Sequence, residues 1–219
     1  MSNNIKMLIF DFDGTIADTF MHTMKITNIL SDEFKFKKVH YHEIDFLKGK
    51  TLQQIIKHLN VPVLKIPSIV AKARSELLKD IENIEPIEGL EKILELIKQA
   101  EVQMGILTTN SRENVEKFLK ANRMETFDFI HSTSRVLGKN HGLRKLMQQH
   151  NGKADEILYV GDETRDIEAA KKEGIKVIAV TWGYNSHAIL QTFSPDFIAH
   201  TPEELFNICV KHVWPGLAF

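Results

Sequence analysis

The segment MLIFDFDGT, residues 7–15, decides the fold of this protein. Its first four residues form a short apolar run typical of a buried parallel strand, and the carboxylates of Asp11 and Asp13 follow at once. In α/β sheets ligands bind at the carboxyl ends of the strands, and side chains two residues apart share a face. Gly14 allows a tight turn that approaches an anion closely, and Thr15 adds a hydroxyl. The segment therefore predicts a first strand that ends in an acidic ligand site.

Two carboxylates this close predict a bound cation. Like charges repel, so both carboxylates stay ionised only when a cation lies between or beside them. Mg²⁺ prefers oxygen ligands and retains coordination positions for a substrate phosphate. We therefore expect Mg²⁺ as the cofactor.

Further apolar runs, each closing on a polar residue or glycine, predict more buried parallel strands. They cover residues 103–107, 127–131, 157–160 and 177–180. Segments with helical spacing alternate with these runs from about residue 87 to the end. This alternation predicts an α/β fold, a doubly wound, Rossmann-like parallel sheet.

Residues 18–85 interrupt this alternation. Their apolar side chains recur at helical spacing, and no core strand is evident among them. Pro86 stands where the α/β alternation resumes. We expect a core made of residues 1–17 and 86–219, with an inserted helical unit over residues 18–85.

Composition excludes several classes of protein. The 219 residues include 28 basic and 29 acidic side chains, a net charge of −1 that lacks the positive field of a nucleic-acid binder. Cys209 is the single cysteine, which argues against disulfides and for a reducing compartment. No signal-peptide pattern opens the chain, and no apolar stretch approaches the length of a membrane helix. We therefore expect a soluble cytoplasmic protein with neither nucleic-acid nor membrane partners; its oligomeric state stays open.

Polar residues follow two later strands in the same way as Asp11 follows the first. The run ILTTNS, residues 106–111, ends in Thr109 and Asn110 just before a predicted helix. The run LYVGDETRD, residues 158–166, ends in acids, with Asp162 and Asp166 four residues apart. Helix N-termini bind anions, and phosphoryl transfer needs a nucleophile, a metal and fixed positive charge.

A lysine that could supply the positive charge lies between these runs. Lys139 follows Gly138 at a loop or helix start. A surface lysine is usually only solvated, and Arg144, Lys145 and Lys153 lie nearby. Its place directly before a helical segment favours Lys139.

The order of these motifs resembles that of the haloacid dehalogenase-like superfamily of phosphohydrolases. The order is Asp-x-Asp-Gly-Thr, an apolar strand ending in Thr, then Lys, then Gly-Asp-x-x-x-Asp. The resemblance covers nearly the whole chain, and residues 18–85 look like the helical cap of that superfamily. The segments 180–185, 195–196 and 201–205 are similar to its phosphoglycolate phosphatase-like branch.

The resemblance implies catalytic roles for four residues. Asp11 would attack the phosphate and become an aspartyl-phosphate, and Asp13 would protonate the leaving alkoxide and then activate water. Thr109 and the backbone N–H of Asn110 would hold phosphate oxygens beside Gly14 and Thr15. Lys139 would neutralise the nucleophile and the transferred group.

The resemblance also implies a ligand set for Mg²⁺. The ligands would be the Asp11 carboxylate, the Asp13 main-chain carbonyl and Asp162. Asp166 would bind through water or orient the other ligands. Whether Glu163 or Asp166 supports the metal stays open.

Lys48, Gly49 and Lys50 of the predicted cap could project positive charge over the site. They would contact a carboxylate or phosphate of the substrate. A helix start with solvated lysines explains the same residues equally well.

The reaction predicted from the resemblance is Mg²⁺-dependent hydrolysis of a small phosphorylated metabolite, phosphoglycolate-like or a sugar phosphate. A sugar phosphomutase of the phosphoglucomutase type uses the same acids and a similar cap. A non-catalytic phosphate-binding regulator with this fold is a third interpretation.

Overall fold

The first strand lies inside a parallel sheet, as expected. The structure, a computed structural model, describes residues 5–100, 102–133 and 138–212. Within these ranges six strands form one sheet in the order β3-β2-β1-β4-β5-β6, and every neighbouring pair is parallel. The strands are β1 (Met7–Phe10), β2 (Gln103–Thr108), β3 (Phe129–Ser132), β4 (Ile157–Gly161), β5 (Lys176–Val180) and β6 (Phe197–Ala199).

Helices connect the strands and form the segment between β1 and β2. They are α1 (Phe20–Phe34), α2 (Ile44–Lys48), α3 (Leu52–His58), α4 (Ile66–Asp80), α5 (Leu90–Lys98), α6 (Arg112–Ala121), α7 (Gly138–Gln149), α8 (Thr164–Lys172), α9 (His187–Thr192) and α10 (Pro202–His212). Short 3₁₀ helices are η1 (Tyr41–Glu43), η2 (Val63–Lys65), η3 (Ile81–Asn83) and η4 (Ala154–Glu156). None of the helices that the structure describes has both the length and the apolar character required to cross a bilayer.

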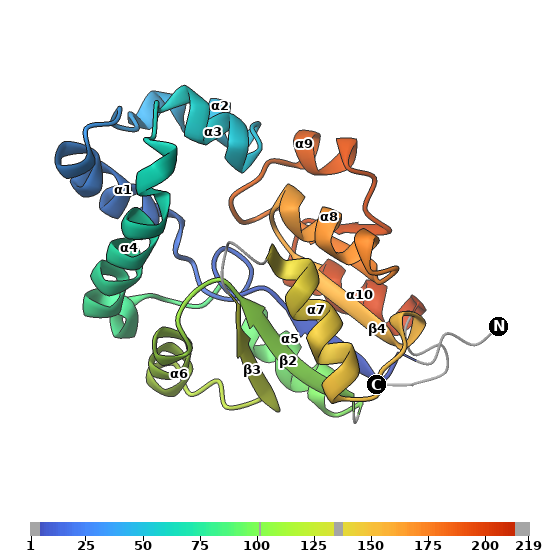
Figure 1. The fold of residues 1–219 in the computed structure, drawn as a ribbon. Coiled ribbons are helices and arrows are strands. Elements are labelled where there is room, and N and C mark those ends of the chain that lie inside the picture. Colours follow the sequence, from blue (N-terminus) through green and yellow to red (C-terminus); the bar gives the residue numbers. More distant parts are fainter. Residues whose placement is uncertain (1–4, 101, 134–137, 213–219) are drawn as a thin grey trace.

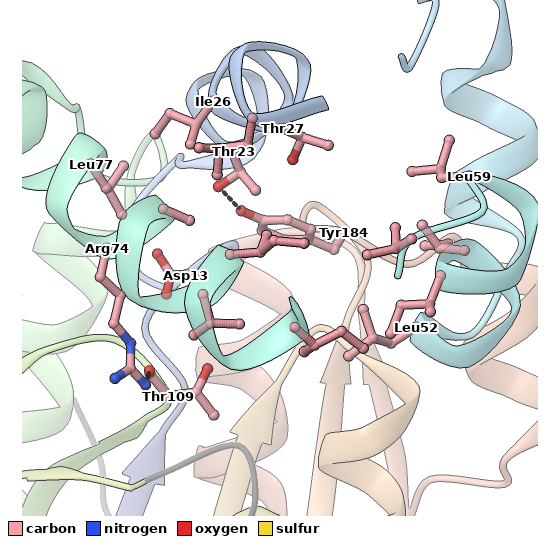
Figure 2. Close-up of a pocket in the computed structure, with 18 of the residues that line it drawn as sticks. Asp13, Thr23, Ile26, Thr27, Leu52, Leu59, Arg74, Leu77, Thr109 and Tyr184 are labelled. Atoms are coloured by element: carbon pink, nitrogen blue, oxygen red, sulfur yellow. Dashed lines mark hydrogen bonds between the residues drawn. The ribbon is translucent and has the colours of Figure 1, made fainter. Parts of the chain in front are cut away.

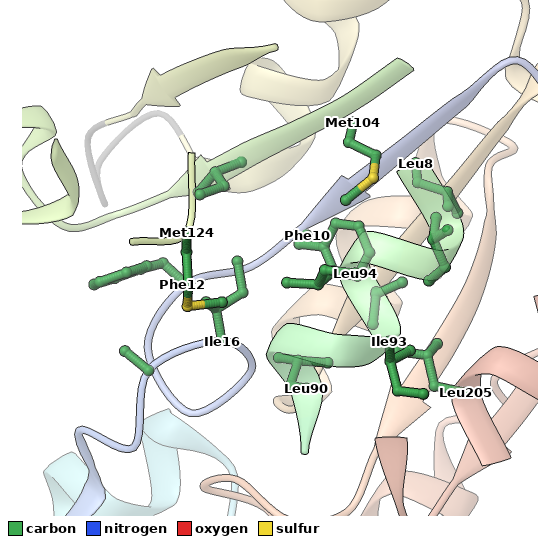
Figure 3. Close-up of a cluster of buried hydrophobic side chains, with 14 of the residues drawn as sticks. Leu8, Phe10, Phe12, Ile16, Leu90, Ile93, Leu94, Met104, Met124 and Leu205 are labelled. Carbon is green, nitrogen blue, oxygen red and sulfur yellow. The ribbon is translucent and has the colours of Figure 1, made fainter. Parts of the chain in front are cut away.

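Helices cover both faces of the sheet, and alternate side chains of each strand point to opposite faces, so both sets are buried. Leu8 and Phe10 of β1 pack in a buried cluster with apolar residues of α5, α6 and α10. Figure 3 shows this cluster, with Leu94 of α5 beside Phe10. Met7 and Ile9 pack in a second cluster with residues of α7, α8 and α9. The apolar run of residues 7–10 therefore lies in the middle of a doubly wound sheet, which confirms the predicted fold class.

The helices α1 to α4 form a separate layer beyond the carboxyl ends of the strands (Figure 1). The backbone segments that enter and leave this layer lie side by side. Ala17 bridges to Pro86, and the backbone N–H of Asp18 donates to the carbonyl of Glu85 at 3.0 Å. This pairing lies where the sequence predicts that residues 18–85 are inserted between residues 1–17 and 86–219. The division into these two units stays a prediction. We call α1 to α4 the cap.

Two edges of the sheet differ from the expected strands. β3 begins at Phe129 rather than at residue 127. Before it, Asp128 contacts Met104 of β2 twice: its N–H donates to the Met104 carbonyl, and its side chain accepts the Met104 N–H, both at 2.7 Å. Phe127 instead packs edge-on against Phe10, with ring centroids 5.9 Å apart. β6 was not expected, since its three residues are too short to stand out as an apolar run.

Candidate active site

The polar ends of the three central strands meet at one edge of the sheet. β1 pairs with β2 on one side and with β4 on the other. Asp11 therefore lies between the residues that follow β2 and those that follow β4, and its N–H donates to Val160 at 2.8 Å. Parallel neighbours carry side chains from distant parts of the chain to one crevice.

Lys139 connects two acids of this site, Asp11 and Asp166. It lies in the first turn of α7, is 4% exposed, and its Nζ donates to Asp11 Oδ2 and Asp166 Oδ1. Burial alone would lower the pKa of Lys139, but the two carboxylates raise it, so the ammonium stays charged. Residues 134–137, which precede this helix in the sequence, lie outside the described residues.

Asp11, Asp162 and Asp166 form a buried cluster of carboxylates. One oxygen from each lies within 4.8 Å of the other two. Burial raises the pKa of Asp162 well above its usual range, and the charges of Glu163, Asp11 and Asp166 raise it further. Burial also raises the pKa of Asp11, against the lowering effect of Lys139. The cluster thus holds more negative charge than Lys139 balances, and its all-oxygen donor set fits a hard divalent cation such as Mg²⁺.

Asp162 and Asp166 are held in place by fixed donors. Asp162 accepts hydrogen bonds from the hydroxyl of Thr15 and the N–H of Tyr184, both at 2.7 Å. Asp166 accepts the hydroxyl of Tyr159 at 3.2 Å and the N–H of Glu163 at 2.9 Å. Because these donors come from the backbone or from buried side chains, the carboxylates are held in position before any ligand binds.

Asp13 faces the cap rather than the carboxylate cluster. The amide of Asn110 donates to both of its carboxylate oxygens, at 3.1 and 3.2 Å. Burial raises the pKa of Asp13, although the hydrogen bonds from Asn110 oppose the rise. A carboxyl with a raised pKa is more readily protonated, as a general acid must be.

Gly14 is required for close packing around Asp162. Its φ is +77°, and a Cβ here would lie 2.4 Å from Asp162 Oδ2 and from the ring of Tyr184. Glycine adopts this left-handed backbone at little cost, whereas other residues do not.

We expect Gly14→Ala to destabilise the fold by about 2–4 kcal/mol, since left-handed strain adds to a clash with Asp162 and Tyr184. Gly174→Ala is a matched control, because Gly174 has φ +72° but its nearest obstacle is 3.8 Å away. Urea unfolding of both variants measures the difference. Equal losses of stability would show that the close approach at Gly14 is unimportant.

Comparison with known proteins agrees with this geometry. Residues 8–180 match the profile of the family described as haloacid dehalogenase-like hydrolase. The chain belongs to this family. A phosphoglycolate phosphatase of Synechococcus elongatus is 27% identical over 204 residues, which span 93% of this chain and 96% of the relative. A pyrophosphatase PpaX of Bacillus cereus is 28% identical over 222 residues, with the same coverage.

A solved structure shows the same fold. A protein described as a predicted phosphatase from Clostridium acetobutylicum superposes with a TM-score of 0.83 at 20% identity, over 95% of this chain and 99% of that one. The profile match over residues 8–180 confirms the expected superfamily. The chain is a haloacid dehalogenase-like hydrolase and an enzyme of the phosphatase type.

Thr109 and Asn110 of this hydrolase lie where β2 ends, beside Asp13. Both are buried. The backbone N–H of Asn110, expected to hold a phosphate oxygen, donates to the hydroxyl of Thr108 at 2.9 Å. A phosphate oxygen would therefore replace or share that partner. The carbonyl of Thr109 accepts a hydrogen bond from Arg74 of the cap.

Lys48, Gly49 and Lys50 lie at the contact between cap and core. The Nζ of Lys48 donates to the carbonyl of Gly183 at 2.9 Å, and the Nζ of Lys50 lies 4.6 Å from the ring of Phe46. Gly49 ends α2. The amide of Asn185 donates to the carbonyls of Lys48 and Lys50, at 3.2 and 3.0 Å. These contacts attach the cap to the loop after β5, and substrate contact by the two lysines stays a prediction.

Two arginines near the site were not expected. Arg165 lies inside the Gly-Asp-x-x-x-Asp motif and pairs with Glu163. Its position between Glu163 and Asp166 in the sequence could have indicated that it lies at the site. Arg74 lies on α4 and reaches the loop after β2. Nothing in the spacing of the cap helices marks it, because its partner is 35 residues away in the sequence.

Proposed function

We propose that this hydrolase removes phosphate from a small phosphorylated metabolite in a Mg²⁺-dependent reaction with an aspartyl-phosphate intermediate. The observation that carries the proposal is the buried cluster in which Lys139 bridges Asp11 and Asp166 while Asp162 lies beside them. A carboxylate beside a fixed ammonium and a cation-binding cluster suits nucleophilic attack on a phosphate.

In the first step the Asp11 carboxylate attacks phosphorus. An O–P bond to Asp11 forms as the ester O–P bond breaks, and Asp13 gives its proton to the departing alkoxide oxygen. The burial that raises the pKa of Asp13 supports this role. In the second step Asp13 takes a proton from water, whose oxygen attacks phosphorus, and inorganic phosphate and the Asp11 carboxylate are released. Lys139 stabilises the charge on the phosphoryl oxygens in both steps.

Asp11, Asp162 and the main-chain carbonyl of Asp13 would hold Mg²⁺. When bound, Mg²⁺ would offset the negative charges of the carboxylates and the phosphate. Asp166 is favoured over Glu163 as the supporting acid, because the Asp166 carboxylate belongs to the cluster. Glu163 instead pairs with Arg165.

The size of the substrate follows from the cap. Helices α1 and α4 lie over the site, and Arg74 of α4 contacts the loop after β2. A covered site admits a small molecule more readily than a macromolecule. The names of the relatives, phosphoglycolate phosphatase and pyrophosphatase, agree with a small substrate.

Hydrolysis of p-nitrophenyl phosphate with and without Mg²⁺ tests the reaction. We expect turnover with Mg²⁺, a loss of at least about 100-fold when the metal is chelated, and recovery when Mg²⁺ is restored. A panel of phosphorylated metabolites then ranks the substrates. Equal turnover with and without Mg²⁺ would exclude the metal from the reaction.

Thermal unfolding tests the metal site without relying on activity. At Mg²⁺ concentrations about 100-fold above the dissociation constant, we expect about 2.7 kcal/mol of added stability. Asp162→Asn should abolish this response, because it removes one carboxylate of the cluster that would hold the cation. Asp155→Asn, at an exposed aspartate before β4, is the control and should keep the full response. An unchanged response in Asp162→Asn would place the metal elsewhere.

A further inference from the structure

A cavity of about 210 Å³ lies between the cap and the active site. It is lined by α1, α3, α4 and by residues of the core, among them Asp13, Thr109 and Tyr184. Figure 2 shows Asp13, Arg74 and Thr109 together at one end and Leu52 and Leu59 at the other, with Tyr184 between them. The cavity therefore runs from the proposed reaction centre into the interior of the cap.

The cap side of this cavity is aliphatic. Most of its lining residues carry hydrocarbon side chains, among them Ile26, Leu52, Ile55, Ile69 and Val70. All five are only partly buried, whereas the buried apolar cluster of the cap is small. These side chains therefore expose hydrocarbon to the cavity. Apolar surface left open in a concave site favours binding of an apolar group.

The hydroxyl of Tyr184, in the middle of the cavity, is already hydrogen-bonded. The hydroxyl of Tyr184 donates to Thr23 at 2.7 Å and lies 3.1 Å from the hydroxyl of Thr19. A sugar that extended along the aliphatic cap side would bury hydroxyls against hydrocarbon with few partners, which is costly.

The charged end of the cavity is suited to the phosphate. Arg74 donates a hydrogen bond to the carbonyl of Thr109. Burial lowers the pKa of Arg74, and the negative charge of Asp13 opposes this change. Its Nε is buried and has no hydrogen-bond partner among the residues that the structure describes. Arg74 lines this end of the cavity, so its positive charge would attract a phosphate there.

We infer that the substrate is a phosphate monoester of an apolar alcohol, whose hydrocarbon part fills the cavity. This inference rests on the proposed phosphatase function and specifies its leaving group. An engineered apolar cavity of about 150 Å³ holds benzene, so this cavity has room for at least about six carbons. The two-carbon leaving group of phosphoglycolate would leave most of it unfilled.

A homologous series of n-alkyl phosphates, from methyl to octyl, tests the inference by turnover. We expect kcat/KM to rise about fourfold with each added methylene until the cavity is full, and then to level off. Phosphoglycolate should fall near the short end of the series. A flat series, or phosphoglycolate as the best substrate, would overturn the inference while leaving the phosphatase function intact.

Binding of n-alkylphosphonates, whose C–P bond is not hydrolysed, tests the cavity without turnover. In calorimetry with Mg²⁺ present, affinity should rise by the same factor per methylene, with an increasingly negative heat-capacity change. If no monoester is hydrolysed but phosphonate affinity still rises with chain length, the proposed function is refuted and the apolar cavity is supported. A flat phosphonate series would refute the cavity.

The variant Ala73→Leu tests whether the alkyl chain of the substrate binds inside the cavity. Ala73 of α4 lines the cavity, whereas Ala71 of the same helix is exposed. In Ala73→Leu the rise should stop at a shorter chain, because the added side chain occupies part of the space. Ala71→Leu is the matched control and should reproduce the wild-type series. Circular dichroism confirms that both variants fold. Identical series for the two variants would show that the alkyl group binds elsewhere.

Discussion

Asp11→Asn should reduce turnover of p-nitrophenyl phosphate by at least about a thousandfold, because the amide cannot act as the nucleophile. The substitution keeps the size and shape of the side chain. It also removes one of the two carboxylates that pair with Lys139, while the pair with Asp166 remains. The protein should therefore fold normally, and a steady-state assay with Mg²⁺ measures the loss.

Asp155→Asn is the matched control for this experiment. Asp155 is exposed and precedes β4, at the edge of the sheet opposite the site. The same change of charge there should leave turnover unaltered. Phosphate release by Asp11→Asn at the wild-type rate would remove Asp11 from the reaction.

Lys139→Met should cost both stability and activity. The change leaves Asp11 and Asp166 buried without their shared cation, and breaking a buried ion pair in this way typically costs about 3–5 kcal/mol. Turnover should fall by at least about a hundredfold, because fixed positive charge at the phosphoryl oxygens is lost. Urea unfolding and the p-nitrophenyl phosphate assay measure the two effects.

Lys145→Met on the same helix separates the role of the site from that of the helix. Lys145 is exposed on α7, so the same substitution there should change stability by less than about 0.5 kcal/mol. Mg²⁺ should restore part of the stability lost in Lys139→Met, since a cation would again offset the carboxylates. If Lys139→Met unfolds like Lys145→Met, the buried ion pairs contribute nothing to stability.

The central part of the fold could be predicted because it depends on local patterns. Each apolar run that became a strand is short, continuous and followed by a polar residue, and such runs suit a sheet covered on both faces. Asp11, Asp162 and Thr109 could be predicted as neighbours because they follow such runs, and residues after parallel strands lie at one edge. The sequence does not separate Lys139 clearly from the nearby Lys145, whereas burial between Asp11 and Asp166 does.

The cap could be predicted only as a helical unit. Helical spacing shows that a segment has an apolar face, but it does not show which partner that face meets. The sequence therefore suggested Lys48 and Lys50 as cations over the site, which stays a prediction, but it did not indicate that Lys48 contacts the loop at Gly183. It left out Arg74, which reaches Thr109 across the gap between cap and core. Both positions depend on how α2 and α4 pack on the core.

The sequence by itself determined the type of sheet, the helices between the first two strands and the acids that follow the first and fourth strands. These features follow from the spacing of apolar residues and from the strand ends, which are local properties. Only the tertiary structure decided which acids share Lys139, that Asp13 faces the cap, and that aliphatic side chains line the cavity above it. These features depend on contacts between segments far apart in the chain, and local spacing does not determine which distant segments meet.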